Sequence, residues 1–246
     1  MTALAGGLVG LVLGNIRLPM LVLAASSPAA GAGANIGVSA VAALAAAIAH
    51  IRAGRIDWRL FAWMAPPSMA GAVVGGLLSG AVPGNALLIV IGVTLLAFGV
   101  DLLRAKPGGR EANAGGFSAR AAILTGALIG VLGGFVGLIL GALRLPALLR
   151  LVGADPFRAV GTNASVGFCL GVAGVFGHLP GGVDWTLLGV GAATSVPGAI
   201  VGAATSVPGA ILGARLTGRL DERQLFRAVG LVLLVAGTAL ILQGIL

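Results

Sequence analysis

Hydrophobic residues fill long uninterrupted blocks of this chain, and the charged residues are confined to the short stretches between them. Six blocks contain no charged residue at all: 18–51, 60–100, 121–143, 159–183, 185–214 and 228–246. Each block can hold at least one helix of the ~20 residues needed to cross a bilayer. The alternation of apolar and polar residues that is typical of a membrane β-barrel is missing. The pattern therefore predicts an all-α integral membrane protein.

The composition supports this fold class. Apolar residues make up 58% of the chain and charged residues 9%, which is too little charge to cover a water-soluble surface. The chain also contains 43 glycines, many of them inside the apolar blocks. Small residues let helices approach closely in lipid, where packing replaces the hydrophobic drive. We therefore expect a compact helical bundle.

The net charge of +8 comes from basic residues in the loops between apolar blocks, with no aromatic residues interleaved among them. An excess of Lys and Arg in short loops is typical of the cytoplasmic face of a membrane protein, and the arrangement does not favour nucleic acid as a partner. The sequence predicts a multi-pass protein of the plasma (bacterial inner) membrane. Its expected partners are the lipid bilayer and a small anionic substrate, and a homo-oligomer is left open.

A duplicated segment organises the chain. Residues 6–19 read GGLVGLVLGNIRLP and residues 133–146 read GGFVGLILGALRLP, with ten of the fourteen positions identical. The similarity continues from 28–40 to 156–168, and His50 and His178 then occupy matching positions. We interpret the chain as one membrane domain made of two repeats, residues 1–110 and 115–246.

Basic residues indicate that the two repeats have opposite orientations. In the first repeat they follow the second and fourth apolar segments, and in the second repeat they follow the first and third. These residues are Arg52, Arg55, Arg59, Arg104, Lys106, Arg110 and Arg120, then Arg150, Arg158, Arg215, Arg219, Arg223 and Arg227. If all thirteen are cytoplasmic, the repeats are inverted, as in the inverted-repeat transporters.

An inverted pair requires an odd number of crossings in each repeat, and we count three. The predicted crossings are 32–51, 60–80 and 85–103, then 159–178, 185–216 and 224–246. The first element of each repeat is then a broken or re-entrant helix, with its turn at 15–17 in one repeat and at 142–144 in the other, near mid-membrane. Eight full crossings, four in each repeat, remain the alternative because residues 121–143 are long enough to cross.

Arg17 and Arg144 are the central candidates for substrate binding. Each is followed two residues later by a proline that suits the first turn of a short helix, so the guanidinium and the positive end of a helix dipole point the same way. With Asn15 beside Arg17, two such ends would form one site for a small oxyanion between them. The alternative is that both arginines snorkel to headgroups or pair with helix carbonyls.

Other polar residues inside the apolar blocks are candidates for lining the same cavity. Asn35, Ser39, Thr162, Asn163 and Ser165 carry amides and hydroxyls that could donate to an anion. Hydrogen bonding between helices, as packing, is the alternative.

His50 and His178 end matching helices, so they could couple transport to protonation. The favoured interpretation places both in loops near the headgroups. Asp57-Trp58 and Asp184-Trp185 are interpreted as caps and interfacial anchors of the helices that follow them.

A second, local duplication lengthens one predicted helix. Residues 191–201 (GAATSVPGAIV) are repeated almost unchanged at 202–212 (GAATSVPGAIL). The eleven extra residues would add ~16 Å of helix, so the segment 185–216 is too long for a straight crossing.

The sequence does not favour an enzyme. The apolar blocks hold no acidic pair, no metal-ligand cluster and no serine with a basic partner, and the single Cys169 forms no paired-cysteine motif. We expect no catalytic residue, no metal and no cofactor. An anion channel and a structural membrane scaffold remain alternatives to a carrier.

At these residues the chain resembles the TauE/SafE family, also called the sulfite exporter or toluene-sulfonate uptake permease family. The resemblance covers nearly the whole chain and is carried by the segments 14–19 and 141–146, by the Ala-Val-Gly-Thr-Asn run at 159–163, and by the His-then-Asp-Trp spacing. It implies a secondary carrier of sulfite, sulfonates or related organosulfur anions. The chain departs from the family at Asn15, Arg17, Ala142 and Arg144, which stand where a three-glycine run usually precedes the proline.

Overall fold

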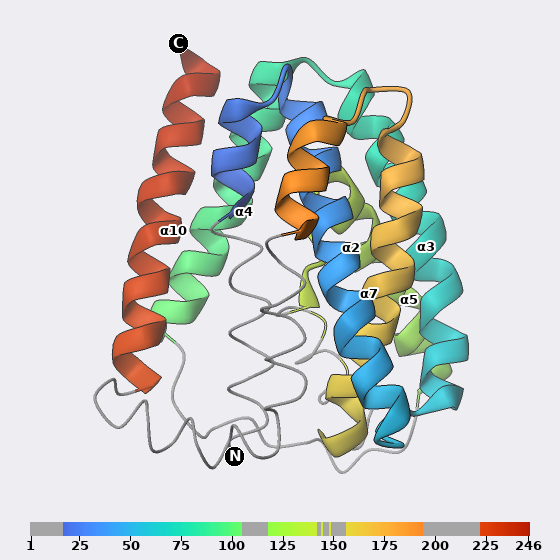
Figure 1. Ribbon diagram of the computed structural model, residues 1–246. Helices are drawn as coiled ribbons and strands as arrows, with labels where there is room; N and C mark the ends of the chain where they lie inside the picture. Colours follow the sequence, from blue (N-terminus) through green and yellow to red (C-terminus); the bar gives the residue numbers. More distant parts are fainter. Residues whose placement is uncertain (1–16, 105–117, 142–143, 145–147, 149–155, 194–221) are drawn as a thin grey trace.

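The computed structural model describes residues 17–104, 118–141, 144, 148, 156–193 and 222–246, and every regular element within them is a helix (Figure 1). The long helices are α2 (Pro28–Arg52), α3 (Trp58–Ala81), α4 (Gly84–Arg104), α5 (Ala119–Val136), α7 (Pro156–His178) and α10 (Glu222–Ile245). Residues 17–24 and 185–193 are also helical. The all-α fold class is confirmed.

Five of the six predicted crossings correspond to long helices in the structure. The predicted segments are 32–51, 60–80, 85–103, 159–178 and 224–246, and they lie in α2, α3, α4, α7 and α10 respectively. The last segment extends one residue beyond the end of α10. α2, α3, α4, α5 and α7 are each long and apolar enough to cross a membrane, and α10 contains a shorter apolar helix, Gly230–Ile245. The sixth predicted crossing is helical over 185–193, and the rest of it, with most of the local duplication, lies outside the described residues.

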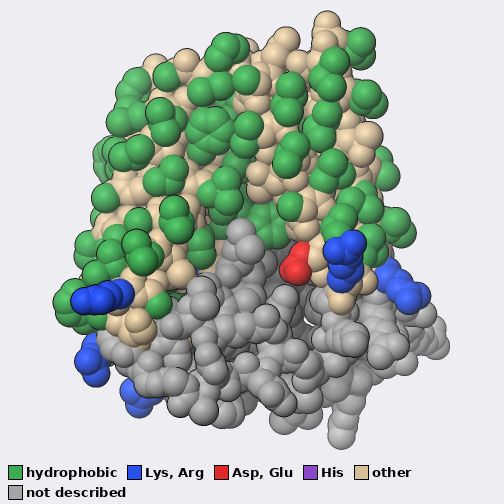
Figure 2. All heavy atoms as spheres, turned by 180° about the vertical axis from the view of Figure 1, so that it is seen from behind, with side chains coloured by type: hydrophobic (Ala, Val, Ile, Leu, Met, Phe, Trp, Pro, Cys, Tyr) green, Lys and Arg blue, Asp and Glu red, His purple; other side chains and the backbone are tan. Residues whose placement is uncertain are grey.

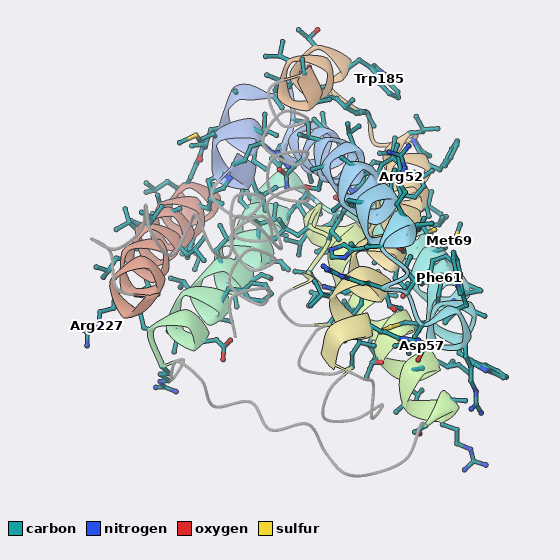
Figure 3. All side chains as sticks on the ribbon, turned by 60° about the horizontal axis from the view of Figure 1, so that its bottom comes forward. Arg52, Asp57, Phe61, Met69, Trp185 and Arg227 are labelled. Carbon is teal, nitrogen blue, oxygen red and sulfur yellow. The ribbon has the colours of Figure 1, made fainter. Side chains whose placement is uncertain are left out.

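Two helix starts are built as the sequence predicts. The Asp57 carboxylate accepts a hydrogen bond from the Leu60 N–H at 3.0 Å, and the Asp184 carboxylate accepts one from the Leu187 N–H, also at 3.0 Å. Both bonds satisfy backbone donors that have no partner inside the helix. The tryptophan after each aspartate is exposed, as Figure 3 shows for Trp185.

α2 and α7, which the repeat matches to each other, pack side by side in opposite directions. A Cβ placed on Gly33, near the start of α2, would lie 3.0 Å from the Cβ of His178, the last residue of α7. A Cβ on Gly161, near the start of α7, would lie 3.0 Å from the Cβ of His50, near the end of α2. The matching glycines therefore contact the matching histidines, each in the other repeat.

α4 and α10, the last matched pair, also pack antiparallel through glycines. A Cβ on Gly92 would lie 2.6 Å from the Gly237 carbonyl oxygen, and one on Gly99 would lie 2.9 Å from the Gly230 carbonyl oxygen. Because glycine carries only a hydrogen atom in place of a side chain, the backbones of α4 and α10 can come into contact at these positions. Antiparallel packing of both matched pairs is the geometry that inverted repeats require.

The exposed arginines of the described residues gather at one end of the bundle. They lie at or near the helix ends that face the bottom of Figure 1, and Figure 2 shows them along the lower rim while hydrophobic side chains cover the surface above. These residues are Arg52, Arg59, Arg104, Arg120, Arg158 and Arg227, with the half-buried Arg55 in the same α2–α3 loop. If the repeats are inverted, the positive-inside rule requires the basic residues of both repeats to lie at the same end of the bundle. We call this the arginine end.

The first element of the second repeat reverses inside the bundle. α5 starts at the arginine end and stops at Val136, where Gly137 has a left-handed backbone with φ of 79°. Leu148, further along, belongs to the same buried cluster as Ala122 of α5 and Ala159 of α7. The chain therefore returns to the end from which it came, which is the geometry of a re-entrant hairpin.

The turn of this hairpin lies earlier than the sequence analysis placed it. Among the described residues, 137–140 are non-helical while 141 and 144 are already helical, and the Arg144 N–H donates to the Leu140 carbonyl at 3.1 Å. The prediction was wrong because Gly137 adopts the left-handed conformation that ends α5, so the break precedes the Leu-Pro pair. The matching residues Asn15 and Ile16 lie outside the described residues.

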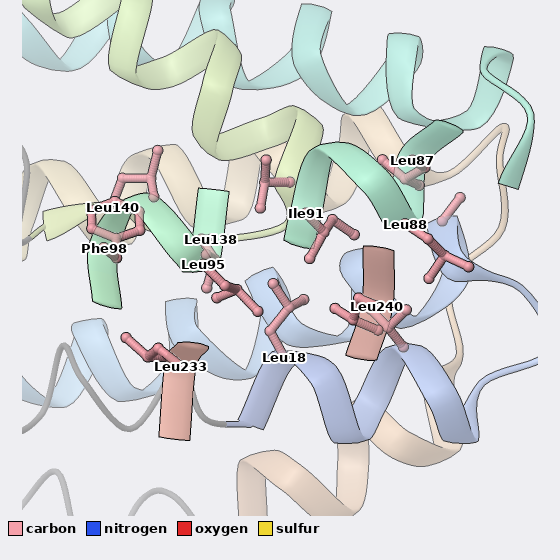
Figure 4. Close-up of a cluster of buried hydrophobic side chains, with 13 residues drawn as sticks. Leu18, Leu87, Leu88, Ile91, Leu95, Phe98, Leu138, Leu140, Leu233 and Leu240 are labelled. Atoms are coloured by element: carbon pink, nitrogen blue, oxygen red, sulfur yellow. The ribbon is translucent and has the colours of Figure 1, made fainter. Parts of the chain in front are cut away.

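Apolar packing holds the reversed segment in place. Val136, Leu138 and Leu140 are buried in a cluster with Leu18 and with the α4 face centred on Ile91 (Figure 4). Gly137 itself fits against α2, because a Cβ on it would lie 2.6 Å from the Ala32 Cα. The turn is thus fixed between α2 and α4.

Replacing Gly137 by alanine should destabilise the protein strongly. The new side chain would have to adopt a left-handed conformation, at a cost of about 1–2 kcal/mol, and would also collide with the Ala32 backbone. Gly54→Ala is the matched control, because Gly54 has a φ of 65° but nothing within 4 Å. Thermal unfolding in detergent should show a clearly larger fall in midpoint for Gly137→Ala. Equal midpoints would contradict the packing described for the turn.

The inversion of the repeats in the membrane can be tested by labelling single cysteines in a Cys169→Ser background. Ala53 and Pro180 are exposed and follow the matching helices α2 and α7. We expect an impermeant thiol reagent added outside intact cells to label Pro180→Cys and to spare Ala53→Cys until the cells are opened. Labelling of both cysteines from the same side would rule out inversion.

Candidate functional site

Arg17 is tied to α2 by hydrogen bonds to two residues. Its Nε donates to the Asn35 Oδ1 at 2.9 Å, and its Nη2 donates to the Ser39 Oγ at 2.7 Å. The Asn35 amide in turn donates to the carbonyl of Gly137 at 2.8 Å, in the turn of the second repeat. This Arg17 cluster joins the two repeats and engages the donors on one edge of the guanidinium.

Arg144 makes fewer bonds with the corresponding helix of its own repeat. Its Nη1 donates to the Asn163 Oδ1 at 3.3 Å, and the Asn163 amide donates to the Gly141 carbonyl, also at 3.3 Å. The Arg144 Nε and Nη2 are buried and have no hydrogen-bond partner among the described residues. The side chain is 0% exposed, so Arg144 does not snorkel to a headgroup.

Within the part of the chain that the structure describes, no acidic side chain forms an ion pair or hydrogen bond with the Arg144 guanidinium. Asp57 precedes α3, Asp101 is exposed near the end of α4, and Asp184 precedes the helix at 185–193. A buried charge without a partner is costly, so it favours a counterion. Arg144 also lies in the first turn after the break, where the positive end of a helix dipole adds to its field. The arrangement can bind an anion.

The described hydrogen bonds of Arg17 and of Arg144 share no residue. Ala40, next to Ser39, faces Gly171 of α7, whereas Asn163 lies eight residues earlier on α7, or ~12 Å along the helix. The buried Ile139 side chain packs against Gly171 and also against Gly167 between them. The described contacts thus form two arginine clusters, and a single site between both arginines stays a prediction.

The hydroxyls of Thr162 and Ser165 form hydrogen bonds with backbone groups of the described residues. The Thr162 hydroxyl donates to the Arg158 carbonyl at 2.8 Å and accepts from the Asp57 N–H at 2.9 Å, which fixes the loop before α3. The Ser165 hydroxyl donates to the Gly161 carbonyl at 3.0 Å within its own helix. Their hydroxyls therefore serve helix packing in this structure, and Asn15 lies outside the described residues.

Both histidines are buried, so the expectation that they lie in loops near the headgroups was wrong. His178 is 0% exposed and His50 is 9% exposed, because each packs against a glycine of the opposite repeat. The His178 Nε2 lies 2.7 Å from the Gly134 carbonyl oxygen, one of the carbonyls left without a helical partner where α5 ends. A coupling role for either histidine stays a prediction.

Sequence reasoning missed the backbone and apolar parts of this site. The carbonyls of Gly137 and Gly141 bind the two asparagines, and Ile139 lies between the clusters. All three residues belong to the duplicated segment 133–146, so the repeat indicated the region of the chain but not these residues. The individual roles depend on where α5 breaks, which the sequence placed several residues too late.

The helices, their apolar exposed faces and the single arginine end define a multi-pass α-helical membrane protein, and the relatives place it among membrane transporters. Residues 1–240 match the family described as sulfite exporter TauE/SafE, and the chain belongs to that family. It is similar to the probable membrane transporter protein YunE of Bacillus subtilis (strain 168), with 25% identity over 270 residues that cover 98% of this chain and 93% of the relative. No solved structure matches the chain significantly.

Proposed function

We propose that this transporter is a secondary carrier that moves small sulfur-containing oxyanions, such as sulfite, sulfonates or related organosulfur anions, across the plasma membrane. The family to which the chain belongs is described as a sulfite exporter family, which supports this substrate class. Arg144 is the residue that would bind the anion, with Asn163 holding the guanidinium in position.

The unpartnered edge of Arg144 is the observation that carries the proposal. Nε and Nη2 lie on one edge of the planar guanidinium, and both are buried without a hydrogen-bond partner among the residues that the structure describes. Two parallel N–H groups match two oxygens of one oxyanion, as in arginine pairs with carboxylates and phosphates. Sulfite and sulfonates present oxygens on a single sulfur in the same way. Such an anion would supply both the missing hydrogen bonds and the missing negative charge.

The position of the site suits a carrier. The contact with Gly167 places the Arg144 guanidinium beside the central residue of α7, and midplane sites built on broken helices are typical of inverted-repeat transporters. Because Arg144 is fully buried, an anion can reach it only after the surrounding helices move. In the proposed cycle, the two repeats rock against each other and open the site to each side in turn.

Purified protein in liposomes should take up radiolabelled sulfite with saturation, and Arg144→Gln should lower this uptake by about tenfold or more. The reason is that glutamine removes the charge and the paired donors, and a hydrogen bond to a charged group is worth about 1.5–3 kcal/mol. Arg144→Lys should restore only part of the uptake, because a lysine cannot make the paired bonds.

Arg104→Gln is the control, since Arg104 is exposed at the end of α4, whereas Arg144 is buried. Its uptake should equal that of the unaltered protein, and all variants should elute as folded protein in detergent. Saturable uptake that persists in folded Arg144→Gln would disprove the site. Uptake that rises linearly with concentration at far higher rates would show a channel instead, and a preference for carboxylates would show a carrier of another anion class.

A further inference from the structure

We propose that His178 is a proton-binding residue that couples anion transport to a proton gradient. Its ring is fully buried at the end of α7, and the added proton would bind to the Nδ1 atom, which makes no hydrogen bond with the described residues. The Nε2 atom keeps its own proton throughout. This inference rests on the proposed function, because it names the driving ion of the same carrier.

The bond to Gly134 fixes which nitrogen of the neutral ring carries the proton. The His178 Nε2 lies 2.7 Å from the Gly134 carbonyl oxygen, and a carbonyl can only accept, so Nε2 is the donor. Nδ1 is then left with a free lone pair. The Ala29 carbonyl of α2 is also near the ring, and it cannot donate to that lone pair either. One proton taken from water would therefore convert the ring to an imidazolium with a donor on each nitrogen.

Three other helices contact His178 at the end of the bundle opposite the arginine end. A Cβ on Gly33 of α2 would lie 3.0 Å from the His178 Cβ, and one on Gly76 of α3 would lie 3.0 Å from the His178 backbone nitrogen. Gly134, which binds the ring, belongs to the last turn of α5. His178 therefore lies where α2, α3, α5 and α7 meet.

Within the described residues, the charged side chains of these four helices all lie at the arginine end. Each is about 20 Å or more along its helix from the residue that meets His178. They are Arg52 of α2, Arg59 of α3, Arg120 of α5 and Arg158 of α7. The other titratable groups of these helices are His50, near the arginine end of α2, and Cys169, more than two turns earlier on α7.

The acidic residue that follows His178 in the chain has another role. The Asp184 carboxylate accepts a hydrogen bond from the Leu187 N–H at 3.0 Å and so caps the helix at 185–193. A proton on Nδ1 would therefore create a buried positive charge that no described carboxylate neutralises. Because such a charge is costly, proton binding favours a conformation in which the ring reaches water.

This requirement links the proton to movement of the two repeats. His178 belongs to the second repeat and packs against Gly33 of the first, so the ring can reach water only when this contact opens. The loop that follows α7 begins with the exposed residues Leu179 and Pro180, which places solvent close to the ring at this end. A carrier that opens here would bind or release a proton in each cycle.

The same movement reaches the anion site through α5. Gly134 lies just before the non-helical residues 137–140, and the Arg144 N–H donates to the Leu140 carbonyl directly after them. Loss of the bond between His178 and Gly134 would remove one support of the hairpin that carries Arg144. Proton binding and anion binding would thus act on the same structural element.

His50, the matching residue of the first repeat, does not suit this role. Arg52 and Arg55 follow it closely, and the Arg55 charge opposes a second positive charge on the His50 ring. No Lys or Arg occurs between His178 and Trp185. We therefore assign the proton to His178, and His50 provides the matched control.

The first test is a pH titration of the histidine rings, which needs no substrate. The chain contains two histidines, so His50→Gln leaves His178 as the single imidazole. Nitrogen NMR of the purified variant, labelled with ¹⁵N-histidine, would be recorded from about pH 8.5 to about pH 4.5. We expect one protonated nitrogen, Nε2, at alkaline pH and two at acidic pH. A ring that stays neutral throughout, or a neutral ring with its proton on Nδ1, would overturn the proposal.

The second test is transport of radiolabelled methanesulfonate into liposomes, with the membrane potential clamped at zero. Methanesulfonate stays an anion over this pH range, so a pH gradient acts on the protein and not on the substrate. If one proton moves with each anion, a gradient of one pH unit in one orientation should raise accumulation up to about tenfold.

His178→Gln should abolish this response to the gradient, because glutamine keeps an amide donor for the Gly134 carbonyl but binds no proton. The variant should still exchange labelled for unlabelled methanesulfonate when no gradient is applied. His50→Gln should respond to the gradient as the unaltered protein does. The NMR titration decides the proposal if His178→Gln fails to fold, since it needs no change at His178.

The outcomes separate this inference from the proposed function. Exchange by the unaltered protein without any response to the gradient would overturn proton coupling and leave the anion carrier intact. A response that persists in folded His178→Gln would overturn the role of His178. An unaltered protein that moves neither sulfite nor methanesulfonate would overturn the proposed function, and the coupling with it. Loss of the response in His178→Gln alone, with a ring that titrates, would support both.

Discussion

A helix break inside a membrane leaves backbone carbonyls that water cannot reach, and the side chains that bind those carbonyls hold the candidate site together. Where α5 ends, the Gly134 carbonyl lies 2.7 Å from the His178 ring nitrogen and the Gly137 carbonyl accepts from Asn35. One residue after the turn, the Gly141 carbonyl accepts from Asn163. Because irregular backbone is tolerated at membrane depth only when it is satisfied by protein or a cavity, these side chains make the hairpin stable.

The same asparagines position the arginines. An asparagine can donate through its nitrogen and accept through its oxygen, so Asn35 and Asn163 each bind a backbone carbonyl and an arginine of the neighbouring segment. One asparagine in each repeat therefore both satisfies a backbone carbonyl and holds an arginine in position. The two clusters differ in how completely the protein satisfies its arginine, and the less satisfied one, at Arg144, is where an anion would gain most.

Much of the fold could be predicted from the sequence, because charge-free length and loop charge are strong signals in a membrane protein. The spans α2, α3, α4, α7 and α10 followed from such patterns. Asn35 and Asn163 were expected to line an anion site, whereas their hydrogen bonds to the arginines were not predicted. The break at Gly137 could not be predicted, because the sequence does not show which glycine of a glycine-rich run adopts the left-handed conformation. The burial of His50 and His178 was also missed, because it depends on contacts between repeats far apart in sequence.

The most direct test of the anion site is a structure of the protein with selenite, a sulfite analogue whose selenium can be located by anomalous scattering. The account predicts a selenium peak beside the Nε and Nη2 edge of Arg144, with two oxygens in hydrogen-bonding range of these atoms. A peak held by Arg17 instead, or an Arg144 edge filled by groups of the protein while selenium binds elsewhere, would contradict it.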